Sequence, residues 1–218
     1  MRLKGVYQSL KIKYGRQKWW PADSRFEVMV GAILTQNTAW VNVERALNNL
    51  KQANALSAKA IIKSNHDVLA QWLKPSGYFN VKAERLKHFC QWYLDHHSYD
   101  GLKYKHTAKL REMLLSVKGV GPETADDILL YAFNRKVFVV DTYTRRLFSR
   151  LGLVDGEIDY ESLRAIFENE LHAETVKTFN EYHALIVMHG KEVCKTSPLC
   201  DECCLQGICK QRDVSAAS

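Results

Sequence analysis

Residues 114–142 combine a glycine-rich turn with a carboxylate that follows an apolar run. Residues 119–122 read Gly-Val-Gly-Pro, and Asp141 comes directly after the apolar residues 137–140. Glycine tolerates the backbone conformations of a tight turn, and proline suits the first helical position because its missing N–H needs no partner there. The backbone N–H groups at the start of such a helix favour a phosphate, and carboxylates rarely occur in apolar surroundings. The pattern therefore predicts chemistry on a nucleic acid.

A cluster of cysteines offers a second kind of chemistry. Five of the six cysteines lie within residues 194–209. Four thiolates so close together can enclose one metal centre, and both zinc and an iron–sulfur cluster accept four sulfur ligands. Zinc modules more often pair two C-x2-C knuckles across a longer loop, so one close pair with wider arms favours a [4Fe-4S] cluster, with zinc as the alternative. The predicted ligands, spaced C-x5-C-x2-C-x5-C with Cys204 as a spare, are Cys194, Cys200, Cys203 and Cys209.

Composition narrows the partners of this chemistry. The 218 residues carry a net charge of +7 and have a pI near 9.0, which favours a polyanionic partner without establishing one. No segment approaches the roughly 18 uninterrupted apolar residues of a membrane span, and the first residues lack the apolar core of a signal peptide. We therefore expect a monomer in the cytoplasm, as in the bacterial cytosol or nucleoid, with no membrane partner. Disulfides are rare in that compartment, which again favours a metal at the cysteines.

Helices must position these residues, because apolar side chains recur at helical spacing almost throughout the chain. Ser24 and Glu27 have the spacing of a capping box and predict the start of a helix. The only strand-like run, residues 137–140, is short enough to be an extended linker. The predicted fold class is therefore all-α. Further predicted helices cover residues 40–50, 79–94, 108–117 and 122–133, with two more from 143 to Gly152 and from 179 to Gly190.

Taken together, these segments resemble the endonuclease III superfamily of DNA glycosylases. That family shares a helix–hairpin–helix motif, followed by a Gly/Pro-rich loop and a catalytic aspartate. The resemblance implies a six-helix domain over 24–133 and a second domain from 1–23 plus 134–218, with a DNA-binding cleft between them. The first cysteine spacing is one residue shorter than the six that the family usually has. The matching segments, in order over residues 20–210, are 34–38, 77–83, 117–125, 139–142, 189–190 and the cysteine loop.

The resemblance also implies roles for individual residues. Asp141 would stabilise the oxocarbenium-like sugar and orient or deprotonate the attacking water. Gln36 would fill the space left by a base that is flipped out of the duplex. The hairpin residues expected to bind DNA are Lys118, Gly119, Gly121 and Thr124. Further candidates for contacts with DNA or with the cysteine loop are Arg145, Arg146, Lys191, Lys195, Lys210 and Arg212.

One departure from the family decides the reaction class. In bifunctional members, a lysine two residues after the second hairpin glycine attacks the sugar and cuts the strand through a Schiff base. Here that position is Glu123, whose carboxylate cannot form a Schiff base and suits the first turn of a helix. Lys118 precedes the first hairpin glycine and is a poor substitute. The predicted activity is that of a monofunctional DNA glycosylase, which hydrolyses the N-glycosidic bond of a damaged base in double-stranded DNA.

The segment Trp19-Trp20-Pro21 narrows the choice of damaged base. It resembles a segment of bacterial 3-methyladenine glycosylases in the same superfamily. An indole face attracts a cationic, alkylated purine by about 0.5–2 kcal/mol, so an alkylated base is predicted. The alternative for the pair is one core ring and one ring that acts as a lid. Two other functions stay open: a bifunctional glycosylase/AP lyase of the endonuclease III type, and a non-catalytic DNA-binding protein with structural zinc.

Overall fold

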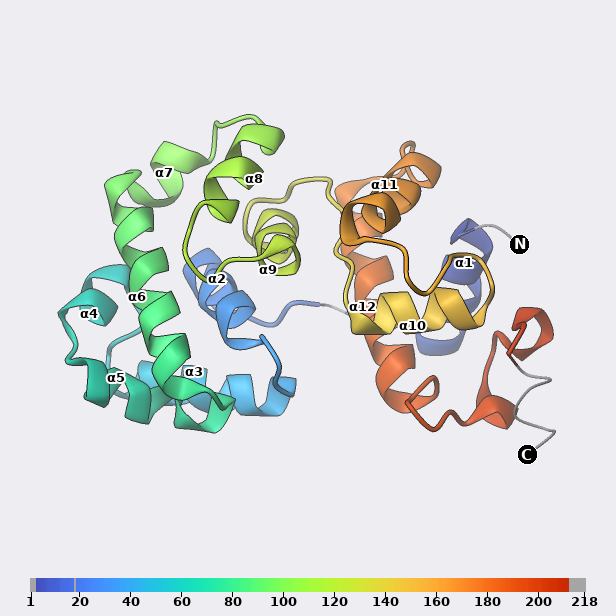
Figure 1. Cartoon of the computed structure of the whole chain (residues 1–218), viewed down its shortest axis with the longest axis horizontal. Coiled ribbons are helices and arrows are strands. Elements are labelled where there is room, and N and C mark those ends of the chain that lie inside the picture. The colour runs from blue at the N-terminus through green and yellow to red at the C-terminus, as the bar shows by residue number, and fades with distance from the viewer. Residues whose placement is uncertain (1–2, 18, 212–218) are drawn as a thin grey trace. The chain divides into compact units, whose positions relative to one another are not determined.

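The fold is all-α, as predicted. The computed structural model describes residues 3–17 and 19–211, which contain twelve α-helices and no β-strand (Figure 1). The chain divides into two compact units, Ala22–Arg135 and Met1–Pro21 with Lys136–Ser218. Among the described helices, none combines the length and the apolar character that crossing a membrane requires.

The unit Ala22–Arg135 is built around helix α6 (Phe79–Asp95). The short helices α4 (Ala58–Lys63) and α5 (His66–Leu73) pack along α6 (Figure 1). Helix α3 (Trp40–Gln52) packs on α5 and on α2 (Arg25–Leu34), whose last eight residues are all buried. The other helices are α7 (Ser98–Leu102), α8 (Thr107–Leu115) and α9 (Pro122–Asp127), which continues as a π-helix over Ile128–Ala132.

Local signals fix where several of these helices begin. Oγ of Ser24 accepts a hydrogen bond of 3.1 Å from the N–H of Glu27, whose carboxylate accepts one of 2.9 Å from the N–H of Asp23. This arrangement confirms the predicted helix start. Ser57 and Asn65 cap α4 and α5 in a similar way. These two helices are too short to show a long apolar period in the sequence, and the unit contains eight α-helices in all.

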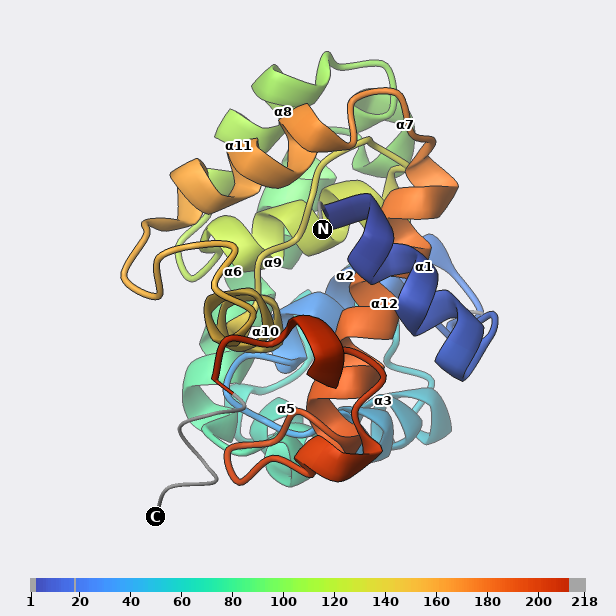
Figure 2. The same ribbon diagram turned by 90° about the vertical axis from the view of Figure 1, so that its right-hand side faces the viewer.

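The second unit is built around α12 (Val176–Glu192). Helices α1 (Leu3–Tyr14) and α10 (Thr142–Arg150) pack on α12, as Figure 2 shows. Helix α11 (Tyr160–Glu170) joins them through an aromatic core, in which the rings of Phe138 and Phe167 are stacked. The buried aromatic residues of this core are Phe138, Phe148, Phe167, Phe179 and Tyr182.

Two details of this unit bear on the prediction. Residues 137–140 form a buried linker, as expected, and no strand lies beside them in the part of the chain that the structure describes. Gly190 does not end α12 but lies inside it, where a Cβ would come within 2.5 Å of Cδ1 of Tyr143. The glycine therefore permits the close approach of α10 and α12.

Candidate active site and metal centre

Asp141 is the N-cap residue of α10. Its Oδ1 accepts a hydrogen bond of 2.7 Å from the N–H of Thr144, and its backbone is extended. The preceding residues 137–140 are buried, so Asp141 lies between an apolar linker and the start of a helix. The first turn of a helix favours negative charge, because its free N–H groups and the helix dipole are positive there.

The second carboxylate oxygen of Asp141 faces α12. Its Oδ2 lies 3.5 Å from Nε2 of His183, and only 11% of the Asp141 side chain and 6% of the His183 side chain are exposed. Burial by itself would raise the pKa of the Asp141 carboxyl. Hydrogen bonding and charge from His183, together with the hydrogen bond from Thr144, outweigh burial and hold this pKa below its usual value. Asp141 is therefore ionised at neutral pH in a site that is largely dry.

The hairpin lies in the other unit, between α8 and α9. Gly119 has a φ of +93°, and a Cβ at this position would overlap the side chain of Arg85. Gly121 is the N-cap residue of α9 with a φ of −94°, and a Cβ there would meet no atom within 4 Å. Only the first of the two glycines is thus required by the fold.

Gln36 follows α2 and is held against the hairpin. Its Nε2 donates to the carbonyl of Gly119 (3.0 Å) and to Oγ1 of Thr124 (2.9 Å), and Arg85 donates to its Oε1. The hydroxyl of Thr124 therefore accepts a hydrogen bond from Gln36, and only 4% of Thr124 is exposed. Contact of Thr124 with a phosphate stays a prediction, as does insertion of Gln36 into DNA.

Lys118 and Glu123 lie on opposite sides of the turn in sequence. Nζ of Lys118 forms an ion pair of 2.7 Å with the carboxylate of Glu84, and 75% of the Lys118 side chain is exposed. Glu123 is exposed in the first turn of α9, where its charge suits the helix dipole.

Lys82 is a buried lysine that sequence reasoning did not single out. Only 1% of it is exposed, and its Nζ donates to the carbonyls of Leu34 (2.8 Å) and Ser76 (2.6 Å). Burial lowers the pKa of Lys82 to about 8, with a smaller effect of Arg85 in the same direction. A lysine of this kind can be a nucleophile, but these two hydrogen bonds and its burial give Lys82 a structural role.

Trp19 and Trp20 are both half-buried, and their rings meet edge to face with centroids 6.2 Å apart. Nζ of Lys191 lies over the ring of Trp19, 5.6 Å from its centroid. This ring face therefore accommodates a cation from the protein itself. Binding of a flipped base by the two tryptophans stays a prediction.

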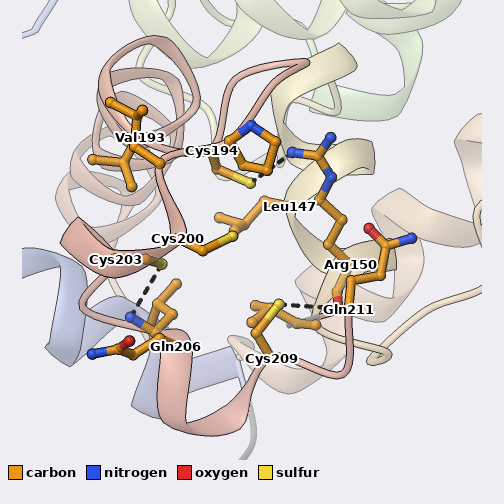
Figure 3. A pocket seen from close by; sticks show the side chains of 13 residues that line it. Leu147, Arg150, Val193, Cys194, Cys200, Cys203, Gln206, Cys209 and Gln211 are labelled. Atoms are coloured by element: carbon orange, nitrogen blue, oxygen red, sulfur yellow. Dashed lines mark hydrogen bonds between the residues drawn. The ribbon is translucent and has the colours of Figure 1, made fainter. Parts of the chain in front are cut away.

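Four cysteines line one cavity of about 260 Å³ at the ends of α10 and α12: Cys194, Cys200, Cys203 and Cys209. Figure 3 shows their side chains arranged around this space. Cys204 is exposed and does not line the cavity. Among the described residues, no three His, Cys, Asp or Glu side chains lie close enough to share one metal ion. Four thiols around one cavity can hold either a single zinc ion or an iron–sulfur cluster.

Hydrogen-bond donors lie beside two of the four sulfur atoms, those of Cys194 and Cys203. Nη1 of Arg150 lies 3.4 Å from Sγ of Cys194, and the N–H of Leu205 lies 3.4 Å from Sγ of Cys203 (Figure 3). Nε2 of the fully buried His189 lies 3.5 Å from the same Cys203 sulfur. Burial raises the pKa of Cys203 to about 11, so a cluster would have to displace its proton. Donors of this kind stabilise cluster sulfurs, which supports the fit.

The structure also gives roles to the two arginines of α10 that were left open. Arg146 donates to the carbonyls of Cys194 (2.8 Å) and Gly190 (2.9 Å), and so holds the start of the cysteine loop. Arg145 donates to the carbonyls of Gly156 (3.2 Å) and Ile158, in the loop before α11. Arg212, predicted near the cluster, lies outside the described residues.

Several residues of these sites could not be singled out from the sequence. His183, Arg150 and Arg85 act through contacts with segments that are distant in the chain. The one available signal is a histidine among the apolar residues of α12. His189, by contrast, lies in the segment 189–190 that matched the family.

Several known proteins are similar to this chain in sequence. A provisionally named DNA repair glycosylase of Methanocaldococcus jannaschii is 46% identical over 207 residues, which cover 94% of each chain. The endonuclease III of Sulfolobus acidocaldarius is 27% identical over 187 residues, covering 85% of this chain and 81% of that protein.

Solved structures agree with these relatives. The 3-methyladenine DNA glycosylase of H. pylori, bound to 1,N6-ethenoadenine, has a TM-score of 0.77 at 31% identity and covers 88% of this chain and 98% of its own. A non-covalent complex of endonuclease III with DNA has a TM-score of 0.84 at 19% identity, with coverage of 99% and 97%, which shows a shared fold. Residues 30–172 match the family described as HhH-GPD superfamily base excision DNA repair protein. The chain therefore belongs to the HhH-GPD superfamily, which includes the endonuclease III enzymes.

Proposed function

We propose that this DNA glycosylase is monofunctional and hydrolyses the N-glycosidic bond of an alkylated base in double-stranded DNA. The observation that carries the proposal is the carboxylate of Asp141, which is ionised although only 11% of its side chain is exposed. A fixed negative charge in a dry site stabilises a developing oxocarbenium ion more strongly than it would in water. The same carboxylate can orient the attacking water or accept its proton.

Glu123 is the reason why we propose that the enzyme does not cut the DNA strand. Its carboxylate occupies the position at which a bifunctional relative has a lysine, and it cannot form a Schiff base. Neither Lys82 nor Lys118 offers a substitute nucleophile. Lys82 is buried and donates to two carbonyls, and Lys118 is paired with Glu84 on the surface.

Gly121 supports a phosphate-binding role for the hairpin. Its φ and its surroundings would both accept an alanine, so the fold does not explain a glycine there. A ligand that approaches the backbone N–H groups at the start of α9 does explain it, and a DNA phosphate is the natural ligand of such groups. Gln36 lies against this same hairpin, which would place it close to the bound strand.

The proposed substrate class rests on the two tryptophans and on one relative. The ring face of Trp19 already holds the ammonium group of Lys191, and a cationic alkylated purine has the same chemical preference. The H. pylori relative is a 3-methyladenine glycosylase, and its structure contains an alkylated adenine derivative, 1,N6-ethenoadenine. An alkylated base is also a good leaving group, so its release needs little acid catalysis.

We further propose that Cys194, Cys200, Cys203 and Cys209 hold a [4Fe-4S] cluster. When bound, such a cluster would tie the cysteine loop to α10 and α12 and so contribute to the stability of this unit. The donors from Arg150, Leu205 and His189 would stabilise its sulfur atoms. The chemistry of base release itself is assigned to Asp141.

The proposal is tested with an end-labelled duplex that contains 3-methyladenine at one position. We expect release of the base and an intact strand, with cleavage only after alkali, and no covalent adduct on treatment with borohydride. Glu123→Gln is the matched control and should give the same products. Cleavage without alkali, or a trapped adduct, would establish the bifunctional alternative. Failure to release any damaged base, together with stoichiometric zinc in a colourless protein, would establish the non-catalytic one.

A further inference from the structure

We propose that His183 is the positioning residue for Asp141, fixing the orientation of its carboxylate and maintaining its negative charge. The proposal rests on the proposed function only in its consequence for base release. Asp141 and His183 lie on the neighbouring helices α10 and α12 of the same unit.

Both oxygens of the carboxylate have a partner in the protein. The N–H of Thr144 holds Oδ1 at 2.7 Å, and Nε2 of His183 faces Oδ2 at 3.5 Å. The first contact fixes the position of the carboxylate along α10, and the second fixes its rotation toward α12. A carboxylate held at both oxygens presents one defined geometry to a sugar, and displacement by about 1 Å can cost about 100-fold in rate.

The spacing of the two helices is itself fixed. Gly190 on α12 lies so close to Tyr143 on α10 that a Cβ would meet the ring at 2.5 Å. Arg146 ties the same helices together by donating to the carbonyls of Gly190 and Cys194. The distance between His183 and Asp141 is therefore set by packing, as a positioning role requires.

Charges in the surroundings favour this pairing. On α12, His183 acts on the Asp141 carboxylate. On α10, burial raises the pKa of Tyr143, and the negative charge of Asp141 raises it further. Arg146 opposes that effect on Tyr143. Tyr143 is therefore neutral at the pH of the reaction and adds no charge beside the carboxylate.

The test uses two variants of the full-length protein. His183→Leu keeps an apolar side chain of similar size but removes the ring nitrogen, and His183→Gln keeps an N–H donor. We expect kcat for release of 3-methyladenine to fall about tenfold or more in the leucine variant, with KM for DNA unchanged. The acid limb of its pH–rate profile should move to higher pH, because Asp141 loses a group that lowers its pKa. The glutamine variant should recover to within about threefold of the wild type.

A measurement on the DNA-free wild type keeps the proposal independent of activity and of variant folding. Nuclear magnetic resonance should show the carboxyl carbon of Asp141 responding to protonation of the His183 ring, and a higher carboxyl pKa in His183→Leu. Independent titration of the two groups would overturn the proposal, as would equal rates for the leucine and glutamine variants. A wild type that releases no base would instead contradict the proposed function, while the titration would still decide the role of His183.

Discussion

The carboxylate site and the cysteine cavity lie on the same two helices but differ in what completes them. Asp141 begins α10 and His183 lies within α12, and both carboxylate oxygens already have protein partners. Near the other ends of these helices, four cysteines line a cavity of about 260 Å³. The partners of the first site are all groups of the protein, whereas we propose that a [4Fe-4S] cluster completes the second.

This difference separates chemistry from stability. Replacement of the Asp141 carboxylate should alter the reaction and keep the fold, because a related side chain can still accept the hydrogen bond from the N–H of Thr144 and cap α10. A change in a cluster ligand should act on the fold, because the free energy of ligand binding contributes to folding. The hairpin shows the same distinction in its two glycines, of which the fold requires only Gly119.

The largest expected effect is the loss of a cavity cysteine. We expect the purified protein to have the broad yellow-brown absorbance of the proposed cluster, and we expect Cys203→Ala to abolish this absorbance and to destabilise the protein. A loss of even about 3 kcal/mol lowers Tm by about 6–12 °C in a chain of this size. Cys204→Ala is the matched control, since Cys204 is exposed outside the cavity, and it should keep both the colour and the Tm. Thermal unfolding and iron analysis check this prediction, and loss of colour in the Cys204 variant alone would contradict the assigned ligands.

The two hairpin glycines should respond in opposite ways. Gly119→Ala forces a side chain into a positive φ and against Arg85, which should cost about 2 kcal/mol of unfolding free energy. Gly121→Ala should change that free energy by less than about 1 kcal/mol. It should nevertheless weaken binding to duplex DNA by about tenfold, or 1.4 kcal/mol, by keeping the phosphate away from the backbone. Urea unfolding and DNA titrations measure both, and unchanged DNA affinity in Gly121→Ala would argue against a phosphate at this turn.

Variants of Arg145 and Arg146 in α10 test which contacts hold the cysteine loop. Arg146→Met removes hydrogen bonds to the carbonyls of Cys194 and Gly190 and should cost about 1–3 kcal/mol, with faster loss of iron to a chelator. Arg145→Met removes bonds to the loop at Gly156 and Ile158 and should leave iron loss at the wild-type rate. Equal rates of iron loss in the two variants would show that Arg146 has no special role at the loop.

Lys82 should affect only the stability of the fold and not the reaction, because it is buried and donates to two backbone carbonyls. Burial lowers its pKa to about 8 from the ordinary 10.5, so between these pH values the unfolded chain binds the additional proton. Stability should therefore rise with pH through this window, by up to about 3 kcal/mol relative to Lys82→Met. Lys118→Met, a surface change, is the control and should keep the wild-type slope. Unfolding curves from pH 7.5 to 10.5 measure the difference, and parallel slopes for wild type and Lys82→Met would contradict it.

Local signals made much of this structure predictable. The capping box at Ser24, the helix after Asp141 and the cysteine spacing all depend on residues close in sequence, and the first two are observed as predicted. Partners on distant helices were not predictable: His183 for Asp141, or Arg85 for Gln36. Their identity depends on how helices pack, which a one-dimensional pattern does not contain. The two hairpin glycines look alike in sequence, and only the backbone angles tell them apart.

We propose that Asp141 is needed for base release but not for the stability of the fold. The most direct test compares single-turnover release of 3-methyladenine by wild type and Asp141→Asn, with unfolding curves of both proteins. We predict release at least about 100-fold slower in the variant. The unfolding free energy should change by less than about 1 kcal/mol, because asparagine caps a helix as well as aspartate does. Release within about threefold of the wild-type rate by the folded variant would contradict the account.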